Sequence, residues 1–283
     1  QVVSIQGVIE EPLLRLSLDR LQARHPLLRV RLTGDDKTIG FTEDGAGPLP
    51  LLVLDRQGDD HWQAVVDIEL NRPFARTDDH LTRLLWLRGP KRSELVIAHH
   101  HVITDALSMV FAVRDLLTDL AALSSGQSLL PPESLPLRPP LPALLPAQSK
   151  GLRLFPAMHD FFFKHVLGKP LRRAKTLPVE QSVPAAQRQN RLVHRSLSGD
   201  LLRQLRDRAK AEQTTVHGAL CAALLLATSA EVFADRLMAE TPTNVGCFSA
   251  VNLRDKLRPS VGQEVGLYIS QVTTFHQVVP PPS

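Results

Sequence analysis

A proline-rich segment near the middle of the chain constrains the fold more than any other feature of the sequence. Residues 129–148 read LLPPESLPLRPPLPALLPAQ and contain seven prolines. Proline has no backbone N–H and a fixed φ, so neither a regular helix nor a central strand tolerates this density. We therefore expect a semi-extended linker that joins two folded halves and packs along a surface through its leucines.

Strand and helix patterns alternate on both sides of the linker, which predicts an α/β (α+β) protein. In the first half we expect strands over 1–8, 28–32, 49–55, 81–89 and 94–102, and helices over 11–24 and from 105 to about 123. In the second half we expect strands over 191–198, 243–254 and 265–275, and helices over 199–212 and 214–231, the last buried because it is apolar almost all round. The predicted boundaries are 1–127 for an N-terminal half, 128–190 for the linker with an irregular helix over 151–173, and 191–283 for a C-terminal half.

Composition limits the possible functions. The 33 basic and 29 acidic residues give a formal charge of +4 and are not grouped in a long basic block, while aromatic residues make up only 5%, so nucleic-acid binding is not expected. Cys221 and Cys247 lack C-x-x-C spacing, which argues against a zinc site or a disulfide framework. Without an 18-residue apolar run or a signal-peptide pattern, we expect a soluble, reduced, cytoplasmic protein with no transmembrane segment.

Three consecutive histidines stand where an apolar strand is expected to end, in ELVIAHHHVITDALSMV (residues 94–110). If the strand continues to 102, its alternation places His99 and His101 on one face and His100 on the other. Asp105 then opens a helix whose stripe of apolar side chains we expect to be buried: Ala106, Met109, Val110, Val113, Leu116, Leu117 and Leu120.

A histidine at the end of a strand suits a general base, because the unperturbed pKa of imidazole lies near neutrality. Asp105 could orient that imidazole, cap the following helix, or pair with an arginine. Two other interpretations stay open. His99 and His101 could be two metal ligands on one strand face, although no further His/Cys cluster supplies a third ligand, or all three rings could be structural and need buried partners.

The run from His100 to Ala106, HHVITDA, resembles the HHxxxDG signature of the CoA-dependent acyltransferase superfamily. Four further segments resemble condensation-type, alcohol and polyketide-associated acyltransferases, in the same order along the chain: LQARHPLLRVRL, NRPFARTDDHLTRLLWL, TTVHGALCAALLLA and VNLRDKLRPSVGQEVGLYIS. One departure is Ala106 in place of glycine, which matters if that position needs a positive φ.

The resemblance implies two chloramphenicol-acetyltransferase-like halves, each a mixed sheet flanked by helices, with a tunnel between them. His101 would be the general base that deprotonates a hydroxyl or amine for one-step attack on an acyl thioester, and His100 would support the loop. Asp105 would be structural and paired with an arginine, for which we expect Arg29. No bound cofactor or metal is implied; the donor would be acyl-CoA or a phosphopantetheinyl acyl carrier protein, and the acceptor a small alcohol or amine.

Other residues follow from the same resemblance. Ser108, with Thr104, lies in the turn after the histidines, and Arg254 and Gly266 match positions that shape the tunnel, so Ser108, Arg254 and Gly266 are our candidates for substrate binding. Relative to the family, we expect the chain to start inside the first strand and the second half to be incomplete. An O-acyltransferase is favoured; the rivals are an amide-forming condensation domain of a peptide synthetase, and an inactive homologue that binds an acyl carrier.

Overall fold

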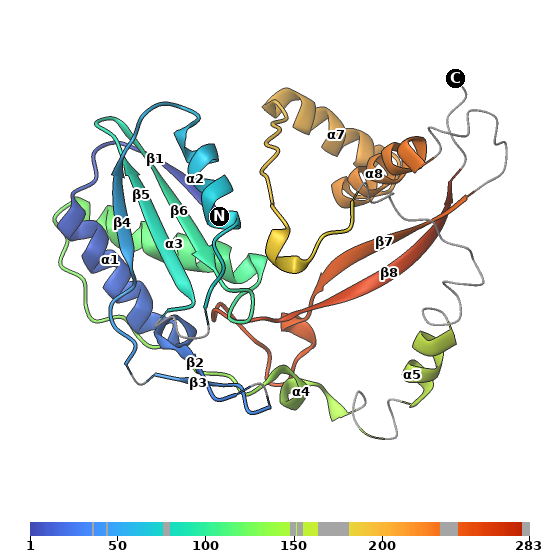
Figure 1. The fold of residues 1–283 in the computed structure, drawn as a ribbon, viewed down its shortest axis with the longest axis horizontal. Coiled ribbons are helices and arrows are strands. Elements are labelled where there is room, and N and C mark those ends of the chain that lie inside the picture. The colour runs from blue at the N-terminus through green and yellow to red at the C-terminus, as the bar shows by residue number, and fades with distance from the viewer. Residues whose placement is uncertain are drawn as a thin grey trace. The chain divides into compact units, whose positions relative to one another are not determined.

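The chain forms two compact units in a computed structural model (Figure 1), which describes residues 1–35, 37–43, 45–75, 80–147, 151, 155–163, 181–232 and 243–278. Unit 1 comprises 1–145, 189–192 and 253–269, and unit 2 comprises 146–188, 193–252 and 270–283. These limits differ from the expected boundaries, because most of the proline-rich segment and residues 253–269 from the second half pack with the N-terminal half.

A four-stranded sheet forms the centre of unit 1, in the order β1 (Val2–Gln6), β6 (Arg92–His99), β5 (Thr82–Arg88), β4 (Leu51–Asp55). β6 is antiparallel to both of its neighbours, whereas β4 runs parallel to β5. β5 is buried along nearly its whole length, as its sequence TRLLWLR requires for a strand that is covered on both faces.

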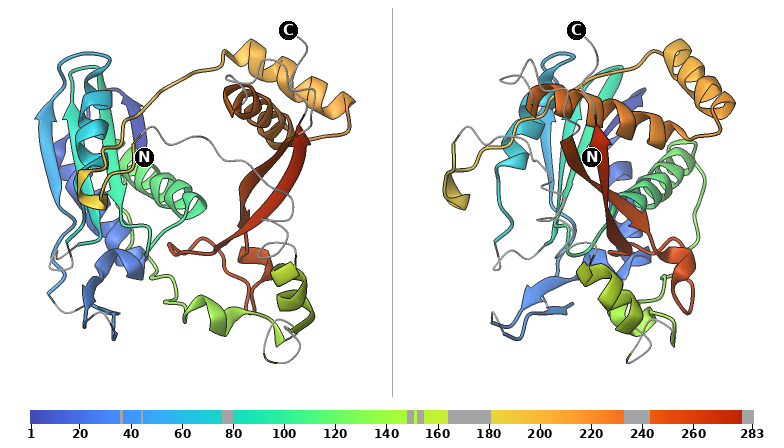
Figure 2. Two further views of the ribbon diagram at one scale, coloured as in Figure 1. Left: turned by 45° about the vertical axis from the view of Figure 1, so that its right-hand side comes forward. Right: turned by 90° about the vertical axis from the view of Figure 1, so that its right-hand side faces the viewer.

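Helices cover both faces of this sheet (Figures 1 and 2). On one face, α1 (Glu11–Arg24) and α3 (Ala106–Ser124) form the main core with Leu84, Trp86 and Leu95. On the other, α2 (His61–Leu70), which the sequence analysis did not assign, packs Val65 against Leu85 and Leu87. Successive side chains of β5 point to opposite faces of the sheet and thus contribute to two separate cores.

Three expectations for unit 1 were wrong in detail. The strand expected over 28–32 is a 3-10 helix at Pro26–Arg29 followed by a short strand, β2 (Arg31–Thr33), paired with β3 (Gly40–Thr42). The histidine strand ends at His99 and not at 102. The buried stripe of α3 is Ser108, Ala112, Leu116 and Leu120, while Val110 is 52% exposed. The stripe differs from the expected one because polar contacts of Ser108 hold the first turn of α3.

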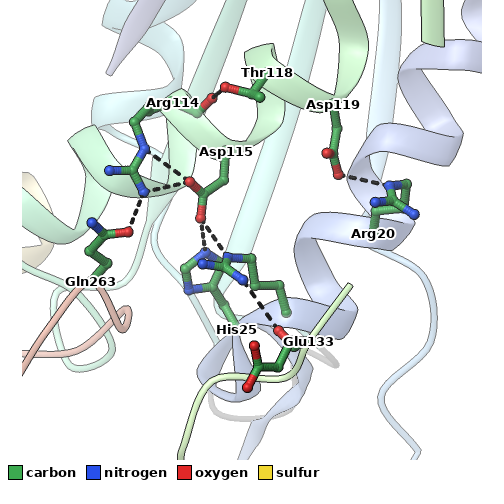
Figure 3. A network of polar contacts seen from close by, with 9 residues as sticks. Arg20, His25, Arg114, Asp115, Thr118, Asp119, Glu133 and Gln263 are labelled. Carbon is green, nitrogen blue, oxygen red and sulfur yellow. Dashed lines mark hydrogen bonds and ion pairs between the residues drawn. The ribbon is translucent and has the colours of Figure 1, made fainter. Parts of the chain in front are cut away.

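Ion pairs join α1 to α3 at the edge of the main core (Figure 3). Asp119 accepts from Arg20 at 2.8 Å, and Asp115 contacts the buried ring of His25 at 3.2 Å. Burial is the main cause that lowers the pKa of His25, although Asp115 acts in the opposite direction. The backbone carbonyl oxygens of Leu130 and Glu133 accept from arginines of α1. These arginines therefore also anchor the proline-rich segment.

The proline-rich segment contains one helical turn, α4 (Leu141–Leu144), which the sequence analysis excluded. A single turn can hold proline at its start because the first N–H groups of a helix have no partner within it. Leu144 is buried against Leu257, Val261 and Tyr268. The expectation that this segment packs through its leucines is confirmed at this residue.

Unit 2 contains α5 (Phe155–Phe161), α7 (Gly199–Ala211), α8 (Val216–Val232), and the two-stranded sheet of β7 (Thr243–Asn252) and β8 (Ile269–Val278). The strand expected over 191–198 is extended chain without a ladder. α8 is not buried as expected: its leucines at 220, 224 and 226 are 45–68% exposed. Most of the rest of the irregular helix expected over 151–173 lies outside the described residues.

No helix in the part of the chain that the structure describes is both long and apolar enough to cross a membrane.

Candidate active site

A tight loop carries the second and third histidines from the end of β6 to the start of α3. The backbone leaves the strand at His99, and His100 donates its N–H to the carbonyl oxygen of Leu81 at 2.8 Å. The Ile103 N–H then donates to the His100 carbonyl oxygen at 3.2 Å, closing a turn. Strand alternation therefore does not place His101, and the shared face expected for His99 and His101 was wrong.

His101 is exposed, and Nδ1 of its ring lies 2.7 Å from the backbone carbonyl oxygen of Thr104. A carbonyl oxygen can only accept, so Nδ1 must carry the proton. In the neutral ring this leaves Nε2 with a free lone pair. The loop thus selects the tautomer in which Nε2 carries no proton, on a residue that is exposed.

The other two histidines have local partners. Nδ1 of His100 accepts the Val102 N–H at 3.1 Å, and its ring meets the Phe74 ring edge-on at 5.7 Å between centroids. Nδ1 of His99 lies 2.7 Å from the hydroxyl of Thr82, and burial lowers the pKa of His99 to about 4. The contacts of His100 thus lie within the loop and with Phe74, while His99 is a neutral ring packed in the sheet.

Asp105 forms the N-cap of α3 and is almost completely buried. Its Oδ1 accepts the Ser108 N–H at 2.8 Å and its Oδ2 accepts the Tyr268 N–H at 2.9 Å. The guanidinium of Arg254 lies 3.0 Å from Oδ1. Burial alone would raise the pKa of Asp105, but the two backbone N–H donors and the arginine charge outweigh it and hold that pKa below its usual value.

The arginine that pairs with Asp105 is thus Arg254, and the expectation that Arg29 does so was wrong. Arg29 follows α1 in the 3-10 helix, where it donates to the carbonyl oxygens of Gln22 and Ala23 and pairs with Glu43 at 3.3 Å. A local sequence pattern cannot identify a partner that lies 149 residues further along the chain. The aromatic ring of Tyr268, 4.6 Å from the Arg254 guanidinium carbon, completes the surroundings of that cation.

Ser108 uses every hydrogen-bonding site of its hydroxyl within the protein. It donates to the carbonyl oxygen of Gly266 at 2.7 Å, accepts the Gly266 N–H at 3.0 Å, and accepts from Arg254 at 2.6 Å. A hydroxyl offers one donor and two acceptor lone pairs, so none remains for a ligand. In this structure Ser108 positions other groups, and a substrate-binding role is not supported by its contacts.

Gly266 allows residues 266–268 to lie directly against this hydroxyl. A Cβ at this position would fall 2.3 Å from Cε2 of Tyr268 and 2.5 Å from its phenol oxygen. The position therefore needs glycine for packing. Arg254 and Gly266 hold the loop in place together with Asp105 and Ser108, and the expectation that they shape a tunnel stays a prediction.

Two contributors were missed by sequence reasoning. The carbonyl of Thr104 fixes the tautomer of His101, and the backbone and ring of Tyr268 enclose the buried ion pair. Tyr268 is the only tyrosine of the chain, a signal that would have marked it as a candidate, whereas a backbone carbonyl leaves no trace in a sequence. Among the residues that the structure describes, no group of three or more His, Cys, Asp or Glu side chains could hold a metal ion.

The first condensation domain of the CDA synthetase superposes with a TM-score of 0.66 at 15% identity, over 100% of this chain and 65% of that one. Polyketide synthase associated protein 5 from Mycobacterium tuberculosis gives 0.61 at 15% identity, over 100% and 64%. The condensation domain that releases the chain from the enacyloxin polyketide synthase gives 0.59 at 20% identity, over 99% and 52%.

The fold is that of the CoA-dependent acyltransferase superfamily. Residues 186–281 also match the sequence profile of the phthiocerol/phthiodiolone dimycocerosyl transferase C-terminus. The resemblance to this superfamily and the mixed α/β fold class are therefore confirmed. A comparison with curated proteins found no significant match.

The chain spans less than two thirds of the length of these solved relatives. The tunnel that the superfamily fold implies between the two halves stays a prediction.

Proposed function

We propose that this chain carries the catalytic histidine of an acyltransferase, which moves an acyl group from a thioester donor to a small acceptor. The contact that supports the proposal is the hydrogen bond from Nδ1 of His101 to the Thr104 carbonyl oxygen. It leaves Nε2 of an exposed residue without a proton and able to accept one, which is the requirement for a general base. Asp105 cannot take this role, because its carboxylate is buried and bonded to Arg254.

The reaction would then take place in one displacement. Nε2 of His101 accepts the proton of the acceptor hydroxyl as its oxygen attacks the thioester carbonyl carbon. The C–S bond breaks, and the departing thiolate sulfur accepts that proton from the imidazolium. During the reaction the Thr104 carbonyl stabilises the positive ring through Nδ1–H, since a hydrogen bond from a charged donor is stronger than one from a neutral donor.

The donor in this proposal is acyl-CoA or an acylated phosphopantetheinyl carrier, and neither is a resident cofactor. The sequence profile matched by residues 186–281 is named for a dimycocerosyl transferase, which favours ester formation over amide formation. The neighbours named as condensation domains keep amide formation on a synthetase as the alternative. We also propose that the reaction takes place in the cytoplasm.

A second candidate function is a non-catalytic carrier- or partner-binding domain. The X-domain from teicoplanin biosynthesis has the same fold, with a TM-score of 0.53, and its structure was solved in complex with OxyB. Fold alone does not choose between catalysis and recruitment. The unprotonated Nε2 of His101 favours catalysis, because recruitment does not require a basic nitrogen.

The decisive experiment measures acyl transfer from a panel of acyl-CoAs and acylated carriers to alcohols and amines, with release of free thiol as the readout. Replacing His101 by Ala should lower the rate by about 10²- to 10⁴-fold, the usual contribution of a general base. His276→Ala is the matched control, because it removes an exposed histidine from β8. Full activity of the His101→Ala protein would refute the role of His101, and an inactive wild type that still binds a carrier would favour recruitment.

A further inference from the structure

A groove of about 410 Å³ lies in unit 1 beside the histidine loop. One of its lining residues is Val102, which directly follows His101. Another part of its wall is 266–269, the segment that is hydrogen-bonded to Ser108 and Asp105. The groove is therefore built partly from the same loop and the same buried network that position His101.

The lining of this groove is mainly hydrocarbon. Large apolar side chains that line it remain exposed: Leu137 at 60%, Phe41 at 45%, Leu267 at 38% and Val102 at 37%. Side chains of this size cluster on an exposed surface mainly where something binds. A volume of this size also falls within the usual range of pockets for small molecules.

The charged side chains at the groove already have partners. Arg138 pairs with the buried carboxylate of Glu264, with Nε 2.9 Å from Oε1, and Glu43 pairs with Arg29 at 3.3 Å. Opposite charges are thus compensated on both sides of the groove. An uncharged apolar group can bind between them without displacing an ion pair, whereas an anion or cation would have to compete with an existing partner.

We propose that this groove binds the hydrocarbon chain of the acyl group, with the thioester end beside His101 and the chain running toward Phe41 and Leu137. This assignment rests on the proposed acyltransferase function and specifies its substrate class as medium or longer acyl chains. Leu137 and Phe41 would then determine which chain lengths are accepted, because their side chains limit the apolar surface that the chain can cover.

The test uses S-ethyl, S-hexyl and S-decyl pantetheine, uncleavable thioethers that share the pantetheine arm of both donor types. Their binding to the whole chain is measured by titration calorimetry, so that no turnover is needed. Each methylene buried in the groove should tighten binding roughly fourfold. Affinity that does not change from the ethyl to the decyl probe would overturn the proposal.

Variants locate the binding site. Leu137→Asp should weaken the decyl probe to the affinity of the ethyl probe and leave the ethyl probe unchanged. Leu130→Asp is the matched control in the same proline-rich segment, because Leu130 is 86% exposed and does not line the groove. Equal binding of the decyl probe by the two variants would place the chain elsewhere and refute the assignment.

Binding and turnover separate the two proposals. Wild type that binds the decyl probe in this groove but transfers no acyl group would refute the catalytic function and leave the groove assignment intact. Wild type that transfers acyl groups with a chain-length preference unaffected by Leu137→Trp would refute the groove assignment and leave the catalytic function intact. A dimer that becomes monomeric on Leu137→Asp, together with no binding of the decyl probe, would show that a second copy covers the groove.

Discussion

The guanidinium of Arg254 donates to both carboxylate oxygens of Asp105, with Nη2 at 3.0 Å from Oδ1 and 3.3 Å from Oδ2. Both side chains are buried, at 4% and 1% exposure. The pair joins the first residue after the histidine loop to residues 253–269 within unit 1. Through this contact, residues in the last part of the sequence fix the position of a loop that lies in its first half.

Breaking this pair should be costly. In Asp105→Asn the side chain can still cap α3, but the Arg254 cation loses its buried counter-charge. Removal of one partner from a buried pair costs about 3–5 kcal/mol, so the free energy of unfolding in urea should fall by that amount, and acyl transfer should fall with it because the loop that carries His101 loosens.

The matched control for this substitution is Asp55→Asn. Asp55 pairs with Arg88 at 2.9 Å, but its side chain is 82% exposed, and an exposed pair contributes no more than about 1 kcal/mol. Equal losses of stability in the two variants would contradict the importance assigned to the buried pair.

Gly266→Ala tests the close packing next to Ser108. The added methyl would lie 2.3 Å from Cε2 of Tyr268, so the ring or the backbone must move, at a cost of about 1–3 kcal/mol. Thermal unfolding measures this cost. Gly199→Ala, where the nearest atom to the new Cβ is 3.7 Å away, should be close to neutral. If Gly266→Ala unfolds like wild type, the packing argument fails.

The sequence predicted the first half of the fold well because its elements follow regular periods. α1 was placed correctly at Glu11–Arg24, and β4 and β5 within two residues, since their apolar patterns match local geometry. The short β2–β3 hairpin and the end of β6 at His99 were missed, because turns and strand ends depend on backbone partners such as the Leu81 carbonyl. Such partners leave no periodic signal.

The candidate site was only partly predictable for a related reason. The capping role of Asp105 follows from residue type and local position, and the general-base role of His101 stays a prediction. The partner of Asp105 does not follow from local position, because Arg254 lies 149 residues further along the chain and meets Asp105 only through the tertiary fold of unit 1. The saturation of the Ser108 hydroxyl likewise depends on Gly266, a contact between residues 158 apart.

Ser108→Ala distinguishes a positioning role from substrate binding. Loss of the hydroxyl leaves the buried N–H and carbonyl of Gly266 without this partner, which should cost about 1–3 kcal/mol of stability. The KM for the thioester donor should change little, because the hydroxyl has no free site for it. Urea unfolding and steady-state kinetics give the two quantities, and Ser196→Ala controls for loss of an exposed serine. A large rise in KM with unchanged stability would restore the substrate-binding interpretation.

The half-buried ring of His99 should make stability depend on pH in a defined window. Burial lowers its pKa in the folded chain to about 4, from an ordinary value of 6.5. Above 6.5 both the folded and the unfolded chain hold the ring neutral, so the full stability is present. As the pH falls below 6.5 the unfolded chain gains a proton and the folded chain does not, so stability falls until about pH 4, by up to about 3 kcal/mol.

Urea unfolding at a series of pH values across this window measures the effect. In His99→Gln the difference between high and low pH should shrink by most of that amount, whatever the substitution costs at neutral pH. His276→Gln removes an exposed histidine of β8 and should keep the pH dependence of wild type. If the His99→Gln and wild-type curves run parallel across the window, the ring of His99 is not the source of the pH dependence.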